Sequence, residues 1–210
     1  MRKLLKDARL ISVVAFSLLS AYLLSFVFEG QVLYSLLAQY GMETDIYILA
    51  AIVAHFIGLF FCGLFVKSPQ VAKRVMASGE LICIAATVPF FFAPSVLWLV
   101  GLAAAGLAGG CSVAAWGNFL KTFIPKNERI KSCADVLIFS NILMIAVNVV
   151  AMNASAYIGL SFSVLCLVIG IVFTWHLPVG ETTSSKSEIE KKRPGDLKKP
   201  LIILSLLFPQ

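Results

Sequence analysis

Residues 95–120, SVLWLVGLAAAGLAGGCSVAAWGNFL, carry no charge and are long enough to cross a lipid bilayer, for which roughly 20 apolar residues suffice. Gly106, Gly110 and Ala114 recur every four residues, so they share one face of a helix. Small residues at this spacing let membrane helices pack backbone to backbone. We expect the central, closely packed helix of a membrane bundle. The alternative is an incidental Ala/Gly-rich span, because glycine is common in membrane helices.

The composition of the whole chain agrees with a membrane protein. Of its 210 residues 60% are hydrophobic and only 13% are charged, against about 25% charged in soluble domains. We expect an all-α, polytopic protein whose residues 1–178 form a six-helix transmembrane bundle. The predicted spans are residues 10–28, 46–66, 75–92, 95–120, 134–151 and 155–178. A charged linker, 179–199, then precedes the truncated start of a seventh span, 200–210, as in a fragment or a truncated gene product.

The basic residues predict the topology. All 17 Lys and Arg lie in the N-terminus, in the links 67–74 and 121–133, or in the linker 179–199, and the alternate links have none. Cytoplasmic loops carry the excess of Lys and Arg, so we expect the N-terminus and the linker to be cytoplasmic. The net charge of +6 is then a feature of the membrane surface, and no nucleic-acid contact is expected within this chain.

No catalytic or metal-binding pattern is evident. The five cysteines are scattered without a CxxC pair, so neither a disulfide framework nor a zinc site is indicated. A glycine-rich phosphate loop, an HExxH helix and a nucleophile elbow are also missing from the sequence. We therefore expect no enzyme activity, no cofactor and no metal.

Two ionisable residues inside predicted spans are candidate substrate-binding or coupling residues, because a charge at the centre of a span costs roughly 2.5–3.5 kcal/mol. His55 lies near the middle of the second span. It either faces a cavity, where it binds substrate or carries a proton, or is a neutral histidine bonded to another helix. Glu80 lies near the cytoplasmic side of the third span. It is either a gate or coupling carboxylate, or the partner of Lys73 or Arg74 in a structural ion pair.

The predicted fifth span holds two further candidates, Asn141 and Asn148. They are seven residues apart and share a helix face, which either lines a cavity or forms hydrogen bonds between helices. Before this span, Ser132-x-x-Asp135 resembles a capping box. We expect Asp135 to cap the start of the fifth helix, where a carboxylate is favourable.

Six spans with both ends inside, a charged linker and the start of a seventh span resemble the N-terminal half of a major facilitator superfamily (MFS) transporter. The link GLFVKSPQVAKR, residues 63–74, keeps one glycine and two basic residues of the family's signature there, and lacks its acidic residue and second glycine. The fourth span lacks the arginine of the family's proton-coupled drug exporters. AWGNFLK, 115–121, and ADVLIFSNILMIAVNVV, 134–150, are similar to a bacterial subgroup, some members of which carry a C-terminal LuxR-type helix-turn-helix domain.

The resemblance implies two inverted three-helix repeats in a bacterial cytoplasmic membrane. It implies a secondary active transporter of an unknown small molecule, which works by alternating access with its site near the bilayer midplane. The expected partners are the lipid bilayer and either a missing C-terminal six-helix half or a second copy. One alternative is a membrane-bound sensor whose DNA-binding domain lies beyond this chain. A weaker one is an intramembrane enzyme or a purely structural six-span protein.

Overall fold

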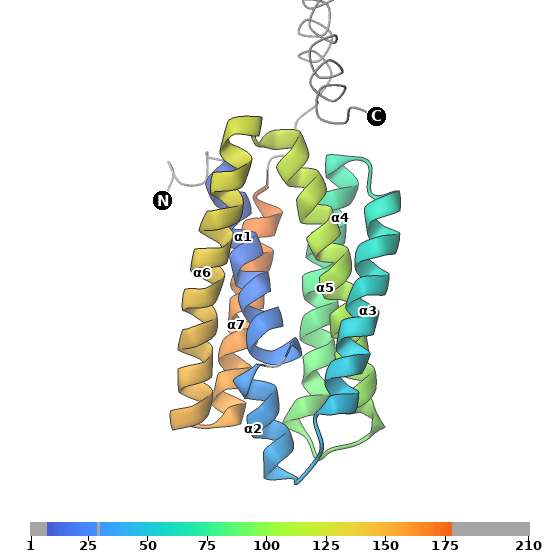
Figure 1. Cartoon of the computed structure of the whole chain (residues 1–210), viewed down its shortest axis with the longest axis vertical. Coiled ribbons are helices and arrows are strands. Elements are labelled where there is room, and N and C mark those ends of the chain that lie inside the picture. Colours follow the sequence, from blue (N-terminus) through green and yellow to red (C-terminus); the bar gives the residue numbers. More distant parts are fainter. Residues whose placement is uncertain (1–7, 29, 178–210) are drawn as a thin grey trace, which may run out of the picture. The chain divides into compact units, whose positions relative to one another are not determined.

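The computed structural model describes residues 8–28 and 30–177, which form an all-α helical bundle (Figure 1). The predicted linker 179–199 and the predicted seventh-span start 200–210 lie outside the described residues. The helices are α1 (Ala8–Tyr22), the π-helix η2 (Leu23–Val27), α2 (Gln31–Gln39), α3 (Asp45–Phe65), α4 (Pro69–Thr87), the 3-10 helix η3 (Val88–Phe91), α5 (Val96–Phe123), α6 (Lys126–Asn153) and α7 (Ala156–Trp175).

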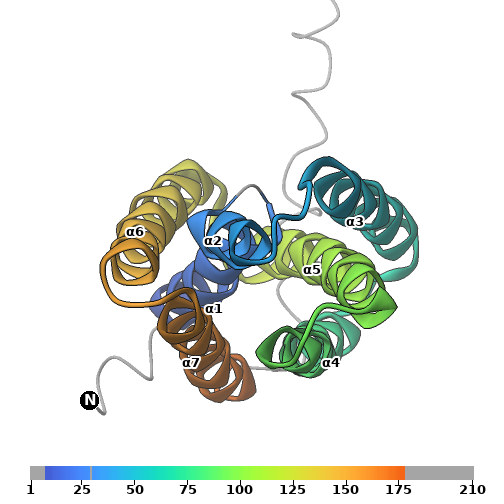
Figure 2. The ribbon, with the colours of Figure 1, turned by 90° about the horizontal axis from the view of Figure 1, so that it is seen from below.

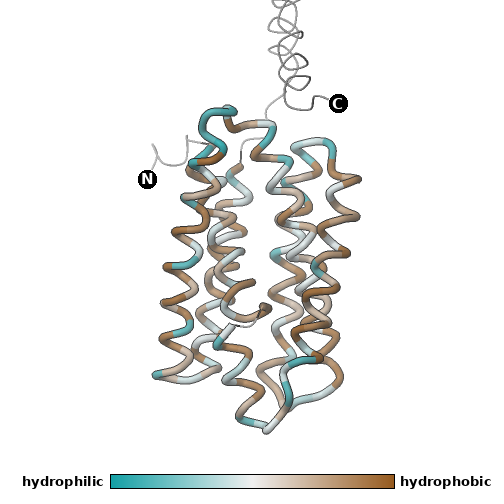
Figure 3. Tube along the Cα trace, in the orientation of Figure 1, coloured by the Kyte–Doolittle hydropathy of each residue, from teal (hydrophilic) through white to brown (hydrophobic). Residues whose placement is uncertain are grey.

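Six helical segments of the described chain are long and apolar enough to cross a membrane. Their outward faces are apolar as well: Phe56, Phe60 and Phe65 of α3 and Ile138 and Ile142 of α6 are all exposed. Hydrophilic positions gather toward the two ends of the bundle (Figure 3). Because contiguous apolar surface of this kind is rare on soluble monomers, the chain is a membrane-embedded protein.

The helices extend beyond several predicted spans. The helix α4 begins at Pro69, where the hydroxyl of Ser68 accepts a bond from the Val71 amide and proline occupies a position that needs no amide donor. The helix α6 begins at Lys126. Asp135 therefore lies inside α6 and does not cap it. The capping-box prediction was wrong because the charged residues before it continue the same helix.

Two helices take inner positions: α5 packs between α3 and α4, and α1 packs between α6 and α7 (Figure 2). The predicted central helix is thus one of two, and the segment that holds α1 is the more buried. The helices α4 and α7 also touch each other. Exchanging α1 with α5, α3 with α6 and α4 with α7 reproduces this set of contacts. A further contact, between α6 and α7, has no counterpart of similar extent. Because α1 begins at the end of the bundle where α5 finishes, the two groups of three run in opposite directions.

Small residues allow α3 and α5 to approach closely. A Cβ atom built on Gly106 would overlap the carbonyl oxygen of Ala51, and one on Gly110 would overlap that of His55. From the other side, a Cβ on Gly58 would overlap the carbonyl of Leu107. Ala114, the third residue of the predicted stripe, is half-buried. The contact is thus made backbone to backbone, as small residues permit between membrane helices.

The first membrane segment, Ala8–Gln39, is broken in its second half. Its α-helix widens into the π-helix η2, in which the Phe28 amide donates to the Leu23 carbonyl over 2.8 Å. A second helix, α2, then starts after Gly30, where a Cβ atom would overlap the Ser25 carbonyl. The sequence predicts a link over residues 29–45, whereas Gln31–Gln39 form α2 because one face of this stretch is buried. This short helix owes its position to one buried face: Val32, Leu33, Leu36 and Leu37.

Candidate functional site

His55 lies where α3 faces α5 and the break in the first segment. Its Nδ1 lies 3.2 Å from the carbonyl oxygen of Gly106. Phe28, the residue that ends η2, packs its ring edge-to-face on the imidazole, with the ring centres 4.8 Å apart. The histidine is half-buried, so three segments of the chain fix its position without closing it off.

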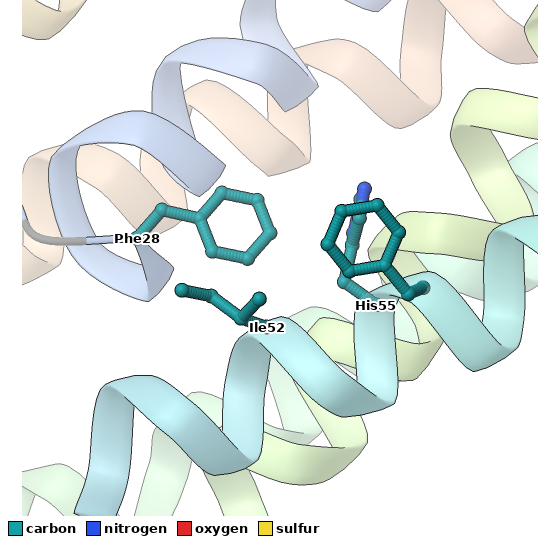
Figure 4. Close-up of a pocket in the computed structure, with 4 residues that line it drawn as sticks. Phe28, Ile52 and His55 are labelled. Atoms are coloured by element: carbon teal, nitrogen blue, oxygen red, sulfur yellow. The ribbon is translucent and has the colours of Figure 1, made fainter. Parts of the chain in front are cut away.

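A pocket of about 330 Å³ opens beside His55 (Figure 4). Its lining residues are Phe28, Ile52, His55 and Phe56. The imidazole is the one polar side chain among these four, and its surroundings are otherwise aromatic or aliphatic. A small set of polar groups in a mainly apolar pocket is the usual character of a small-molecule site.

Phe28 also borders a second hollow, between α1 and α6. This one measures about 210 Å³ and is lined by Phe16, Ser20, Leu23, Leu24, Phe28, Val136, Leu137 and Ser140. The break in the first segment therefore has a pocket on each side. Discontinuous membrane helices commonly form the binding sites of transporters, and π-turns are frequent at functional sites.

Glu80 lies on a different seam, between α4 and α7. Its side chain is fully buried, and its Oε1 accepts a hydrogen bond of 3.1 Å from the Thr174 hydroxyl. Its Oε2 has no hydrogen-bond partner among the described residues. Lys73, one of its predicted ion-pair partners, instead donates to the carbonyls of Trp175 and Leu177 at the end of α7, at 2.6 and 2.9 Å.

The two asparagine candidates differ in their surroundings. Asn141 is exposed, and its amide donates to the Leu137 carbonyl of its own helix over 2.6 Å. Asn148 is half-buried, and its Oδ1 is enclosed without a hydrogen-bond partner in the described part of the chain. His55 lies between α3 and α5, Glu80 between α4 and α7, and both asparagines on α6, so the structure does not gather them into one site.

Several polar contacts between helices escaped the sequence analysis. The Trp116 indole donates to the Ser12 hydroxyl over 2.9 Å and stacks on Phe16, with ring centres 4.1 Å apart. The Tyr22 hydroxyl lies 2.8 Å from that of Thr87. Arg9 forms an ion pair with Asp135 between α1 and α6. In the sequence, a polar side chain inside a membrane span indicates that it needs a hydrogen-bond partner. Which residue becomes that partner depends on how the helices pack.

Comparison of the chain with protein-family models, with curated proteins and with solved structures finds no match. The described residues also contain no group of three or more His, Cys, Asp or Glu side chains placed to hold a metal ion. The interpretation of the site therefore depends on its own geometry.

Proposed function

We propose that the chain is a six-helix unit of a secondary active transporter that moves a small molecule by alternating access. The observation that carries this proposal is the packing pattern: two groups of three helices in opposite directions make corresponding contacts. Inverted repeats of this kind underlie many transporter folds, with substrate bound near the midplane where the repeats meet. The pocket at the broken first segment is lined by Phe28 and by residues of α3, and its His55 contacts the Gly106 carbonyl of α5, a helix of the other group.

The proposed location is the bacterial cytoplasmic membrane, with the basic end of the bundle in the cytoplasm. Every Lys and Arg of the described residues lies in a link or within two helical turns of one end: Arg9, Lys67, Lys73, Arg74, Lys121, Lys126, Arg129 and Lys131. Contacts between α1 and α6 and between α4 and α7 show that these are the same end. The excess of basic residues in cytoplasmic loops supports this orientation.

In an alternating-access transporter the opposite wall of the substrate path comes from a second six-helix unit. We propose either a further part of the same protein or a second copy of this chain as that unit. The exposed apolar faces of α3 and α6 suit contact with lipid or with such a unit.

A counterflow experiment tests the proposal. A thermal-shift screen of small metabolites on the protein encoded by the complete gene would identify a ligand, and proteoliposomes preloaded with that ligand should then take up its radiolabelled form. Saturable exchange supports transport. Tight binding without exchange would contradict it and would favour the membrane-bound sensor. The 210-residue chain reconstituted as a monomer is expected to show no saturable uptake, because one wall of the path is absent.

A further inference from the structure

We propose that the pocket beside His55 binds an uncharged aromatic ring carrying a single N–H or O–H donor, which bonds to Nε2 of His55. This inference rests on the proposed function and names its substrate class. Three features carry it: the hydrogen bond that fixes the imidazole, the lining of the pocket, and the helix break that supplies Phe28 to that lining.

The hydrogen bond to Gly106 fixes the tautomer of the imidazole. A carbonyl oxygen only accepts, so Nδ1 must donate its proton over the 3.2 Å that separate the two atoms. In a neutral imidazole the other nitrogen then has a free lone pair. No described residue donates a hydrogen bond to this Nε2. Among the four lining side chains, this Nε2 is therefore the one hydrogen-bond acceptor, and the contact with Gly106 of α5 fixes the ring that carries it.

The remaining walls select against charge and in favour of a flat ring. Phe28, Ile52 and Phe56 supply aromatic and aliphatic surface, and the four lining residues include no carboxylate, lysine or arginine. Figure 4 shows Phe28, Ile52 and His55 around the space. Phe28 and His55 touch edge-to-face and so form one wall together, beside which Ile52 and Phe56 complete the lining. An aromatic ring packs favourably against such faces. A ring without a donor would leave the Nε2 lone pair unpaired, which costs affinity.

The helix break links this pocket to the conformational cycle. Phe28 follows the π-helix η2 directly and lies two residues before Gly30, the residue that precedes α2. A change of angle between α1 and α2 would therefore move Phe28 relative to His55, because His55 stays hydrogen-bonded to Gly106 of α5. Ligand in the pocket favours the arrangement in which both side chains touch it, since a ligand shifts an equilibrium only by its difference in affinity for the two states.

The test compares two probes of nearly equal shape on the 210-residue chain in nanodiscs. Indole carries an N–H donor, and benzothiophene replaces it with sulfur. We expect saturable binding of both, with indole about 5- to 10-fold tighter, as one hydrogen bond provides. Nitrogen NMR of isotope-labelled histidine should show the Nε2 resonance of His55 shift with indole and not with benzothiophene.

Two substitutions separate the role of Nδ1, which bonds to Gly106, from the role of Nε2, which accepts the ligand's hydrogen bond. His55→Asn places an amide N–H near the former Nδ1, so the bond to Gly106 and the fold are retained while the preference for indole over benzothiophene disappears. His55→Gln places its amide oxygen near the former Nε2 and should keep the preference. The control is His176→Asn, because the Nδ1 of His176 also meets a backbone carbonyl, that of Val172, but in its own helix at 2.7 Å.

The outcomes distinguish this pocket from the transport proposal. If wild-type protein and His55→Asn prefer indole equally, or if the Nε2 resonance does not shift, the proposed binding site is rejected. Counterflow that persists unchanged in His55→Asn with the identified substrate also overturns it, and leaves the transporter standing. Indole binding that depends on His55, in a protein without counterflow, supports the pocket and rejects transport.

Discussion

Glu80 is a carboxyl group with one hydrogen bond and complete burial. An ionised carboxylate in such a place loses its hydration without a counter-charge, and this loss costs several kcal/mol. No Lys, Arg or His forms an ion pair with it among the described residues. The side chain is therefore held by the Thr174 hydroxyl and by its packing on α7, where a Cβ added to Gly170 would lie 3.2 Å from Oε1.

Substitution of Glu80 separates shape from charge. In Glu80→Gln the neutral amide keeps the acceptor for Thr174 at a lower cost of burial, so thermal stability in detergent should equal or exceed that of the wild-type protein. In Glu80→Ala a cavity forms and Thr174 loses its partner, which should cost about 2 kcal/mol. Thermal unfolding followed by intrinsic fluorescence would measure both. Equal losses in the two variants would show that the carboxylate charge itself is engaged.

At this scale the sequence points to individual residues and does not identify their partners. The rarity of ionisable groups in apolar spans was enough to select His55 and Glu80. Their partners, Gly106 and Thr174, lie 51 and 94 positions away in sequence, and only the packing of the helices brings them together. Lys73 shows the same limit: it could have reached a carboxylate, but the carbonyls at the end of α7 offer a cation favourable contacts.

At the scale of a single element, α5 contains glycines that close packing requires and glycines that it does not require. Gly110 faces the backbone of α3, whereas Gly117, two turns later in the same helix, has no atom within 4 Å of an added Cβ. We expect Gly110→Ala to force α3 away from α5 and cost about 1–3 kcal/mol. Gly117→Ala should be neutral or slightly stabilising, because alanine is the better helix former.

Thermal unfolding of the two glycine variants in the same detergent would measure this difference. The backbone shift in Gly110→Ala should also weaken the His55–Gly106 bond, which the histidine nitrogen NMR spectrum would report. Equal stability of the two variants would show that the close approach of α3 and α5 contributes little.

The first membrane segment shows what an element-level pattern cannot reveal. A continuous apolar run predicted one span ending near residue 28, whereas the chain forms α1, a π-helix and a separate α2. Apolar content measures the tendency to enter the membrane, and it carries little information on the register of backbone hydrogen bonds. Glu29 and Gly30 are the local signals at this point of the sequence. A charged residue also fits the simple end of a span, and glycine is too common in membrane helices to indicate a break.

For the whole molecule, the number and order of membrane helices follow from hydropathy, because the bilayer requires each segment to satisfy its own backbone bonds. Hydropathy does not predict which of these helices contact each other in the bundle. The expectation of two inverted units came from a family resemblance, and no residue-level repeat marks them in the sequence. The corresponding contacts of α1 and α5 emerge only in three dimensions, since many different side chains can fill equivalent helix contacts.

The orientation of the whole bundle in the membrane can be tested by cysteine labelling. On a background without native cysteines, Glu43→Cys and Asn127→Cys place one thiol at each end, and both positions are exposed. In intact bacterial cells a membrane-impermeant maleimide should label Glu43→Cys and reach Asn127→Cys only after permeabilisation, because the basic link beside Asn127 is retained in the cytoplasm. Labelling of Asn127→Cys in intact cells would reverse the orientation. Equal labelling of both would mean that the described Lys and Arg do not determine it.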